Sequence, residues 1–265
     1  MEVGDSLGYT PLHFAAWNGH LKVVHFLMDK ANLEAKNYNG ETPLHLAAQW
    51  GHLNVVKALA RHKANIFAKD QQKSSAIHWA ARKGHEDVVE YLITENSKLL
   101  AEPGTESRTV LHEAATLGHM NLVKLLIQKN AQLLKMASDD NETALHAAVN
   151  QGHLAVVKYL VENKIDVAAQ DNDGQTAEAL AAKLGKHDIV RFLQGLNESE
   201  EVVAHDIKAE EIKAIAIELP EIAQPGPIPA ITTLTGQTVH VAVPRPKRMG
   251  YRQAIGRSNA GIRAY

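Results

Sequence analysis

The stretch TPLHFAAWNGH, from Thr10 to His20, decides the fold because the chain repeats it. It returns as TPLHLAAQWGH at Thr42, SAIHWAARKGH at Ser75, TVLHEAATLGH at Thr109 and TALHAAVNQGH at Thr143, with a degenerate copy, TAEALAAKLGK, at Thr176. Successive starts lie 32, 33, 34, 34 and 33 residues apart. A fixed period near 33 is typical of stacked supersecondary units, none of which can cover its apolar face alone.

Each copy predicts two short helices joined at a glycine. The threonine suits a helix N-cap, and the proline that follows it in two copies suits the first helical turn. Paired alanines allow close helix approach, and the glycine of the G-H pair fits a left-handed C-terminal residue. A second helix follows, as in HLKVVHFLM from His20, where apolar residues recur at helical spacing.

These motifs make the chain resemble the ankyrin-repeat family, which is marked by T-P-L-H-x-A-A and G-H-x-x-V-V in a unit of 33 residues. The match covers about 190 of the 265 residues. The resemblance implies an all-α repeat solenoid of paired antiparallel helices, with β-hairpin loops on one side of the stack. Six repeats would occupy residues 1–196, and residues 197–265 would form a small C-terminal α/β or partly disordered extension.

Departures from the repeat predict local differences. The turn glycine present at Gly8, Gly40 and Gly174 is replaced by Lys73, Ser107 and Asn141. Lysine adopts positive φ poorly, so the hairpins leading into copies three and four are expected to be altered. The polar sixth copy is expected to cap the stack. The first copy is not cap-like, which predicts either a missing upstream segment or a contact at that end.

The histidines are interpreted as structural rather than catalytic. Five occupy the T-P-L-H slot and five the G-H slot, whereas a catalytic histidine is normally single and oriented by a unique partner. His112 and Glu113 come near an H-E-x-x-H zinc motif, but position 116 is threonine. No phosphate-binding or nucleophile motif occurs, and the chain has no cysteine. We therefore expect a protein without enzymatic activity, metal or cofactor.

Bulk composition favours a soluble protein. Apolar residues make up 45% of the chain and charged residues 22%, with a formal net charge of −2. The first residues carry no basic and apolar leader pattern, and no apolar run approaches the length of a membrane span. The expected location is the cytoplasm, or a host cytoplasm if the chain is a secreted effector. A monomer is expected.

The variable positions of the repeats suggest a binding surface. The resemblance implies that the residue after L-H, the two before the glycine and the hairpin tips face the concave side. All three tryptophans and several cations fall on such positions in copies one to three, and aromatic and arginine side chains often dominate interface energy. The candidate partner-binding residues are Tyr9, Phe14, Trp17, Asn18, Tyr38, Gln49, Trp50, Lys73, Arg82, Lys83 and Arg108. Trp17 and Trp50 are the expected anchors, whereas Trp79 is the tryptophan most expected to be core.

The extension suggests further elements and partners. Residues 198–221 are acidic and fit an amphipathic helix that caps the last repeat, and residues 230–243 fit a hairpin around Thr235, Gly236 and Gln237. Residues 222–265 contain no acid and six bases: Arg245, Lys247, Arg248, Arg252, Arg257 and Arg263. This basic tail could attach to nucleic acid or anionic lipid, or be a solvated end.

The main hypothesis is a non-catalytic scaffold that recognises a protein or peptide on its concave face. One alternative is the targeting half of a bacterial-type effector or larger enzyme, whose activity lies in or beyond the extension. A second alternative is attachment to nucleic acid or lipid through the basic tail.

Overall fold

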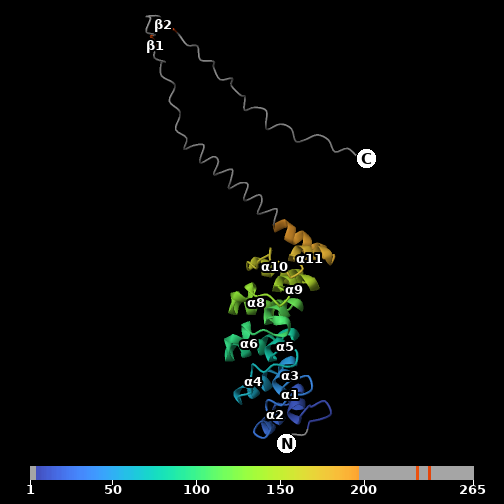
Figure 1. Cartoon of the computed structure of the whole chain (residues 1–265). Helices are drawn as coiled ribbons and strands as arrows, with labels where there is room; N and C mark the ends of the chain where they lie inside the picture. Colours follow the sequence, from blue (N-terminus) through green and yellow to red (C-terminus); the bar gives the residue numbers. More distant parts are fainter. Residues whose placement is uncertain (1–3, 197–230, 233–237, 240–265) are drawn as a thin grey trace, which may run out of the picture. The chain divides into compact units, whose positions relative to one another are not determined.

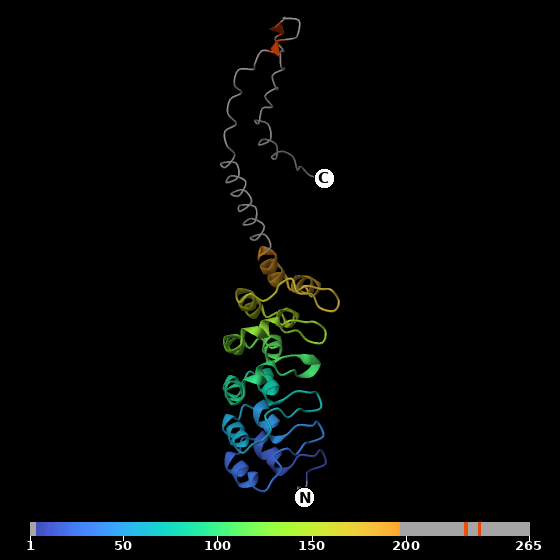
Figure 2. The same cartoon turned by 60° about the vertical axis from the view of Figure 1, so that its left-hand side comes forward.

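Stacked helix pairs make up most of the described chain. The computed structural model describes residues 4–196, 231–232 and 238–239. The chain divides into a unit of residues 1–207 and a unit of residues 208–265. Within the first unit, first helices of the pairs form one column, and second helices form a parallel one (Figure 1). The hairpin loops of successive repeats project on the same side (Figure 2).

The helix bounds follow the sequence repeat. The first helices of the pairs are α1 (Pro11–Trp17), α3 (Pro43–Gln49), α5 (Ala76–Lys83), α7 (Val110–Thr116), α9 (Ala144–Gln151) and α11 (Ala177–Lys183). The second helices are α2 (Leu21–Met28), α4 (Leu53–Arg61), α6 (Glu86–Glu95), α8 (Met120–Lys129), α10 (Leu154–Glu162) and residues 187–196. Short 3₁₀ turns η1 (Ser97–Ala101), η2 (Thr105–Ser107) and η3 (Ala131–Lys135) lengthen two linkers.

The core runs the length of the stack because each repeat covers its neighbour. The paired alanines are buried in the first five copies, as at Ala47 and Ala48, and α3 packs against α5. Helices α4, α6, α8 and α10 bury the residues at their V-V positions, as at Val55 and Val56, whereas Val23 of α2 is 45% exposed. The glycines of the G-H pair adopt φ near +70°, as predicted for a left-handed helix end.

Two predictions about the hairpins have different outcomes. The hairpin of copy three is not altered: Lys73 adopts a φ of 62° and donates from its backbone to Asp70, as Gly40 donates to Asn37. The Asp70 carboxylate also accepts from the backbone of Gln72 and Ser74, which holds the turn against the strain at lysine. That prediction was wrong because the turn is fixed by the aspartate rather than by the glycine slot.

The hairpin of copy four is altered, as predicted. Glu106 and Ser107 both have positive φ and form η2 in place of the simple turn. Neighbouring hairpins are joined by backbone hydrogen bonds, such as Tyr38 to Leu7 and Asp139 to Glu106. The hairpin tips are therefore ordered relative to each other.

The second unit contains one described element. Strands β1 (Ile231–Thr232) and β2 (Thr238–Val239) pair antiparallel, with Ile231 opposite Val239. Both strands lie within the segment for which a hairpin was predicted, and the predicted turn at Gly236 lies outside the described residues. The predicted acidic helix and the basic tail from Arg245 to Arg263 lie outside the described residues. In the described residues, no helix has the length and apolar character needed to cross a membrane.

Candidate functional site

The histidines of the T-P-L-H slot are fixed inside the stack. His13 accepts a hydrogen bond at Nδ1 from the backbone N–H of Thr10, so its proton lies on Nε2. Nε2 then donates to the carbonyl oxygen of Glu41 in the next repeat, at 3.0 Å. The other four histidines donate in the same way to Ser74, Glu102, Glu142 and Gln175. These bonds confirm the structural interpretation of the slot.

Burial makes these imidazoles poor bases. Desolvation, with a smaller effect of Lys69, lowers the pKa of His78 to about 3. Desolvation, with a smaller effect of Arg108, lowers the pKa of His112 to about 4. The pKa of His45 is also lowered, mainly by burial. The folded chain therefore favours the neutral form of these imidazoles.

The histidines of the G-H slot join repeats from the other side. His52 Nε2 donates to the carbonyl of Trp17 at 2.8 Å, and His85 donates to that of Gln49 at 3.0 Å. The imidazole also lies against the glycine of the preceding repeat: a Cβ on Gly19 would come within 2.6 Å of the His52 ring. The candidate anchors therefore sit on backbone that the following repeat holds in place.

Four of the predicted residues form one aromatic cluster: Tyr9, Phe14, Trp17 and Trp50. The rings of Trp17 and Trp50 stack with centroids 6.1 Å apart, and Tyr9 lies 5.7 Å from Trp17 and 5.6 Å from Phe14. Such offset and tilted pairs are favourable geometries for aromatic rings. Two different repeats thus supply one continuous aromatic surface.

This aromatic cluster remains open to solvent. Trp50 is 50% exposed and Phe14 is 43% exposed, whereas Trp17 and Tyr9 are half-buried beneath them. Burial, with a smaller effect of Glu41, raises the pKa of Tyr9, so its hydroxyl stays protonated at neutral pH. The cluster is an apolar surface with a neutral polar edge.

The remaining predicted residues surround the aromatic cluster or lie in the next repeats. Tyr38 is 66% exposed on its hairpin, and Asn18 and Lys83 are exposed at the ends of α1 and α5. Gln49 is half-buried, and Lys73 is exposed on the third hairpin. Sequence reasoning missed Leu7, which is exposed on the first hairpin and whose carbonyl accepts a hydrogen bond from Tyr38.

Two of the predicted cations have partners within the stack. Arg82 forms a two-pronged ion pair with Glu113, through Nε to Oε2 and Nη2 to Oε1 at 3.0 Å each. Its guanidinium also lies 5.1 Å from the centroid of the Trp79 ring, and Trp79 Nε1 donates to Asp70. Arg108 pairs with Glu142 at 3.0 Å. Both arginines join adjacent repeats, so the predicted cations that remain exposed are Lys73 and Lys83, in the third repeat.

Two isolated histidines also differ from one another. His62 Nε2 lies 3.0 Å from Asp29 Oδ1 of the preceding repeat. His25 is exposed on α2. Across the described part of the chain, no group of three or more metal-ligating side chains comes together.

Comparisons with known proteins agree with this architecture. The family model for ankyrin repeats (three copies) matches residues 1–70, 66–137 and 132–204. No curated protein sequence is similar enough to count as a match. Among solved structures, one chain is 28% identical in the structure of the Bd0816 predatory endopeptidase from Bdellovibrio bacteriovorus in complex with immunity protein Bd3460. The similarity covers 73% of this chain and 99% of that one, with a TM-score of 0.64. The chain belongs to the ankyrin-repeat family.

Proposed function

We propose that the chain is a non-catalytic binding module that recognises a protein through the aromatic cluster of its first two repeats. The carrying observation is the Trp17–Trp50 stack, because half of the Trp50 side chain lies open to solvent. Exposure of large aromatic rings to water is unfavourable, and binding of a partner would remove these rings from water. Trp and Tyr are also the side chains most often found at the energetic centre of interfaces.

Hydrogen bonds fix the backbone beneath the aromatic cluster, which favours a role in recognition over incidental exposure. Trp17 is held from below by the His52 hydrogen bond to its carbonyl, and Tyr9 follows the Asp5 turn, whose carboxylate accepts from the Tyr9 backbone. A surface that is already ordered loses little side-chain entropy on binding. A rigid aromatic platform of this kind suits a preformed site.

The chemistry of the partner follows from the surroundings. Tyr38 and Leu7 lie exposed on the first two hairpins and are joined by a backbone hydrogen bond, and Lys73 and Lys83 lie exposed in the third repeat. An apolar segment followed by carboxylates would match this order. The similar chain from the endopeptidase–immunity protein complex supports a protein as partner, and ankyrin repeats generally bind rather than catalyse.

Matched substitutions test the proposal. Partners are captured on the wild-type chain, the most abundant one is purified, and its Kd is measured for wild type, Trp50→Ala and Leu117→Ala. Leu117 is the control because it fills the same repeat slot in copy four and is 46% exposed. We expect Trp50→Ala to weaken binding at least about tenfold, which corresponds to about 1.4 kcal/mol. Equal affinities for all three proteins would contradict the proposal.

A further inference from the structure

A repeating contact on the second helices points to a second binding site. In three places a cation of one repeat covers an aromatic ring of the next: Lys57 over Tyr91, Lys124 over Tyr159 and Lys158 over Phe192, at 5.6, 5.8 and 5.6 Å from the ring centroid. The cations occupy one slot of the repeat and the rings the slot after it. Aromatic side chains therefore fill several of the spaces between neighbouring second helices.

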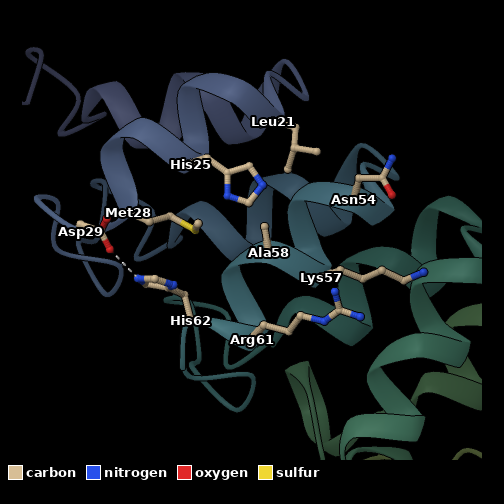
Figure 3. A pocket seen from close by; sticks show the side chains of 9 residues that line it. All are labelled: Leu21, His25, Met28, Asp29, Asn54, Lys57, Ala58, Arg61 and His62. Atoms are coloured by element: carbon tan, nitrogen blue, oxygen red, sulfur yellow. Dashed lines mark hydrogen bonds and ion pairs between the residues drawn. The ribbon is translucent and has the colours of Figure 1, made fainter.

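The first of these spaces lacks its ring. In α4 the aromatic slot holds Ala58, and His25 of α2 stands in the slot of the covering cation. The result is a cleft of about 410 Å³ between α2 and α4, lined by His25, Met28 and Ala58 among others (Figure 3). A volume of this size falls in the range of ligand pockets. Helices α2 and α4 belong to the column of second helices, on the side opposite the projecting hairpins (Figure 2).

The rim of the cleft is positive. Lys57 and Arg61 line it from α4, and Asp29 from the end of α2. Asp29 is already bound by His62, as the dashed contact in Figure 3 shows. The lining thus holds two permanent cations and one carboxylate that has a partner, and the Lys57 amine also lies 5.6 Å from the centroid of the Tyr91 ring. An anionic group on a ligand would meet net attraction there.

We propose that the α2–α4 cleft binds an aromatic side chain of a partner protein that carries a carboxylate beside it. The ring fills the space that Tyr91 fills one repeat later, with His25 in the place of Lys57. The carboxylate pairs with Lys57 and Arg61. This site shares no residue with the aromatic cluster and does not depend on it.

The test uses the full chain labelled with ¹⁵N and an acetylated, amidated probe peptide, Glu-Glu-Phe-Glu-Glu. Chemical-shift changes are expected at the backbone amides of α2 and α4, saturating with peptide. Peptides with Ala in place of Phe, or Lys in place of Glu, are expected to bind at least tenfold more weakly. Equal binding of these control peptides, or shift changes elsewhere on the stack, would overturn the proposal.

Two sets of variants make the test specific. Ala58→Tyr places in the cleft the residue that copies three and five carry, so we expect it to keep the fold and abolish the shift changes. Leu125→Tyr makes the same substitution in the slot of α8 and is expected to leave binding unchanged. Should Ala58→Tyr not fold, the double variant Lys57→Glu, Arg61→Glu is expected to bind the Lys peptide instead of the Glu peptide. Retained Glu-peptide binding in a folded variant of either kind would refute the site.

A small-molecule arm separates the possible sources of the ligand. The compound 3-phenylpropionate offers the ring and the carboxylate without a peptide backbone. We expect it to bind more weakly than the peptide, because the rim residues then contact a single charge. Tighter binding of 3-phenylpropionate would assign the cleft to a small aromatic acid and overturn the protein partner.

Discussion

Single residues in this chain divide into those that the stack requires and those that it leaves free. Thr10, His13 and Gly19 recur because they cap a helix, bond the next repeat and accommodate its histidine. Phe14 and Trp17 vary between copies, and they belong to the aromatic cluster. The recurring residues of the repeat therefore explain stability, whereas the candidate binding residues lie at the variable positions between them.

The G-H pair yields a test of close packing. Gly118 has a φ of 72°, and a Cβ there would approach the His153 ring to 2.6 Å. Gly185 has a φ of 67° with nothing near its Cβ position. Both Gly→Ala variants bear the cost of a left-handed alanine, about 1 kcal/mol. We expect Gly118→Ala to lose at least about 1 kcal/mol more in urea unfolding; equal losses would show that the imidazole contact is unimportant.

The buried histidines make stability depend on pH. For two of them the pKa is lower in the folded chain than the ordinary value of 6.5: about 3 for His78 and about 4 for His112. The stability that the neutral form contributes is complete above pH 6.5 and is lost as the pH falls toward about 4 for His112 and about 3 for His78. Each histidine is expected to reduce the free energy of unfolding by up to about 1.4 kcal/mol per pH unit.

Urea unfolding between pH 7 and pH 5 checks this dependence. His112→Gln removes one titrating group and is expected to flatten the slope by about one proton. A wild-type free energy of unfolding that is constant over this interval would contradict the burial of neutral imidazoles.

Between elements, side-chain bonds join each repeat to the next. Arg82 at the end of α5 holds Glu113 of α7, and Arg108 holds Glu142 of the following hairpin. Exposed arginines at partner-facing positions were predicted from the sequence, but their carboxylate partners lie 31 and 34 residues away and only the stacked fold brings them close. The sequence pattern located the slots correctly and could not tell which charges were already paired.

Removal of Arg82 should therefore be costly. Arg82→Ala leaves the buried Glu113 carboxylate without its cation, and we expect a loss of about 3 kcal/mol in the free energy of unfolding. Arg191→Ala is the control because its pair with Asp188 is exposed on both sides and should change stability by less than about 0.5 kcal/mol. Unfolding in urea measures both. A similar small effect for the two variants would show that the Arg82 pair is dispensable.

Other elements show how far sequence reasoning reached. Helix pairs, their order and their capping threonines were predictable because each is encoded by a local pattern that recurs. The unaltered hairpin at Lys73 was not, because the Asp70 carboxylate and its backbone donors compensate for the missing glycine. The α2–α4 cleft was also missed. The signal in the sequence is Ala58, in a repeat position where the other copies carry larger residues. Its meaning becomes visible only once the structure shows which space those larger residues fill.

Across the whole stack, the effect of a destabilising substitution should depend on which repeat carries it. Each repeat contacts only its neighbours, so an end repeat is held on one side and a central repeat on two. Leu126 lies in α8, and Leu193 lies in the last described helix; both are buried. Either Leu→Ala change removes core contacts worth about 2–5 kcal/mol.

Hydrogen exchange detects the difference between these two positions. Leu193→Ala is expected to speed amide exchange in residues 176–196 while the second to fourth repeats stay protected. Leu126→Ala is expected to speed exchange across several repeats on both sides. Uniform acceleration by Leu193→Ala would mean that the stack unfolds as one unit instead.

The stack carries two separate candidate contact regions. One is the aromatic cluster beside the hairpins, and the other is the α2–α4 cleft among the second helices. The central claim concerns the first, and hydroxyl-radical footprinting of the wild-type chain with its purified partner tests it most directly. We predict reduced oxidation of Trp50, Phe14 and Tyr38 in the complex, with no change at the equally exposed Leu117. Unchanged oxidation of Trp50 in a saturated complex would contradict the account.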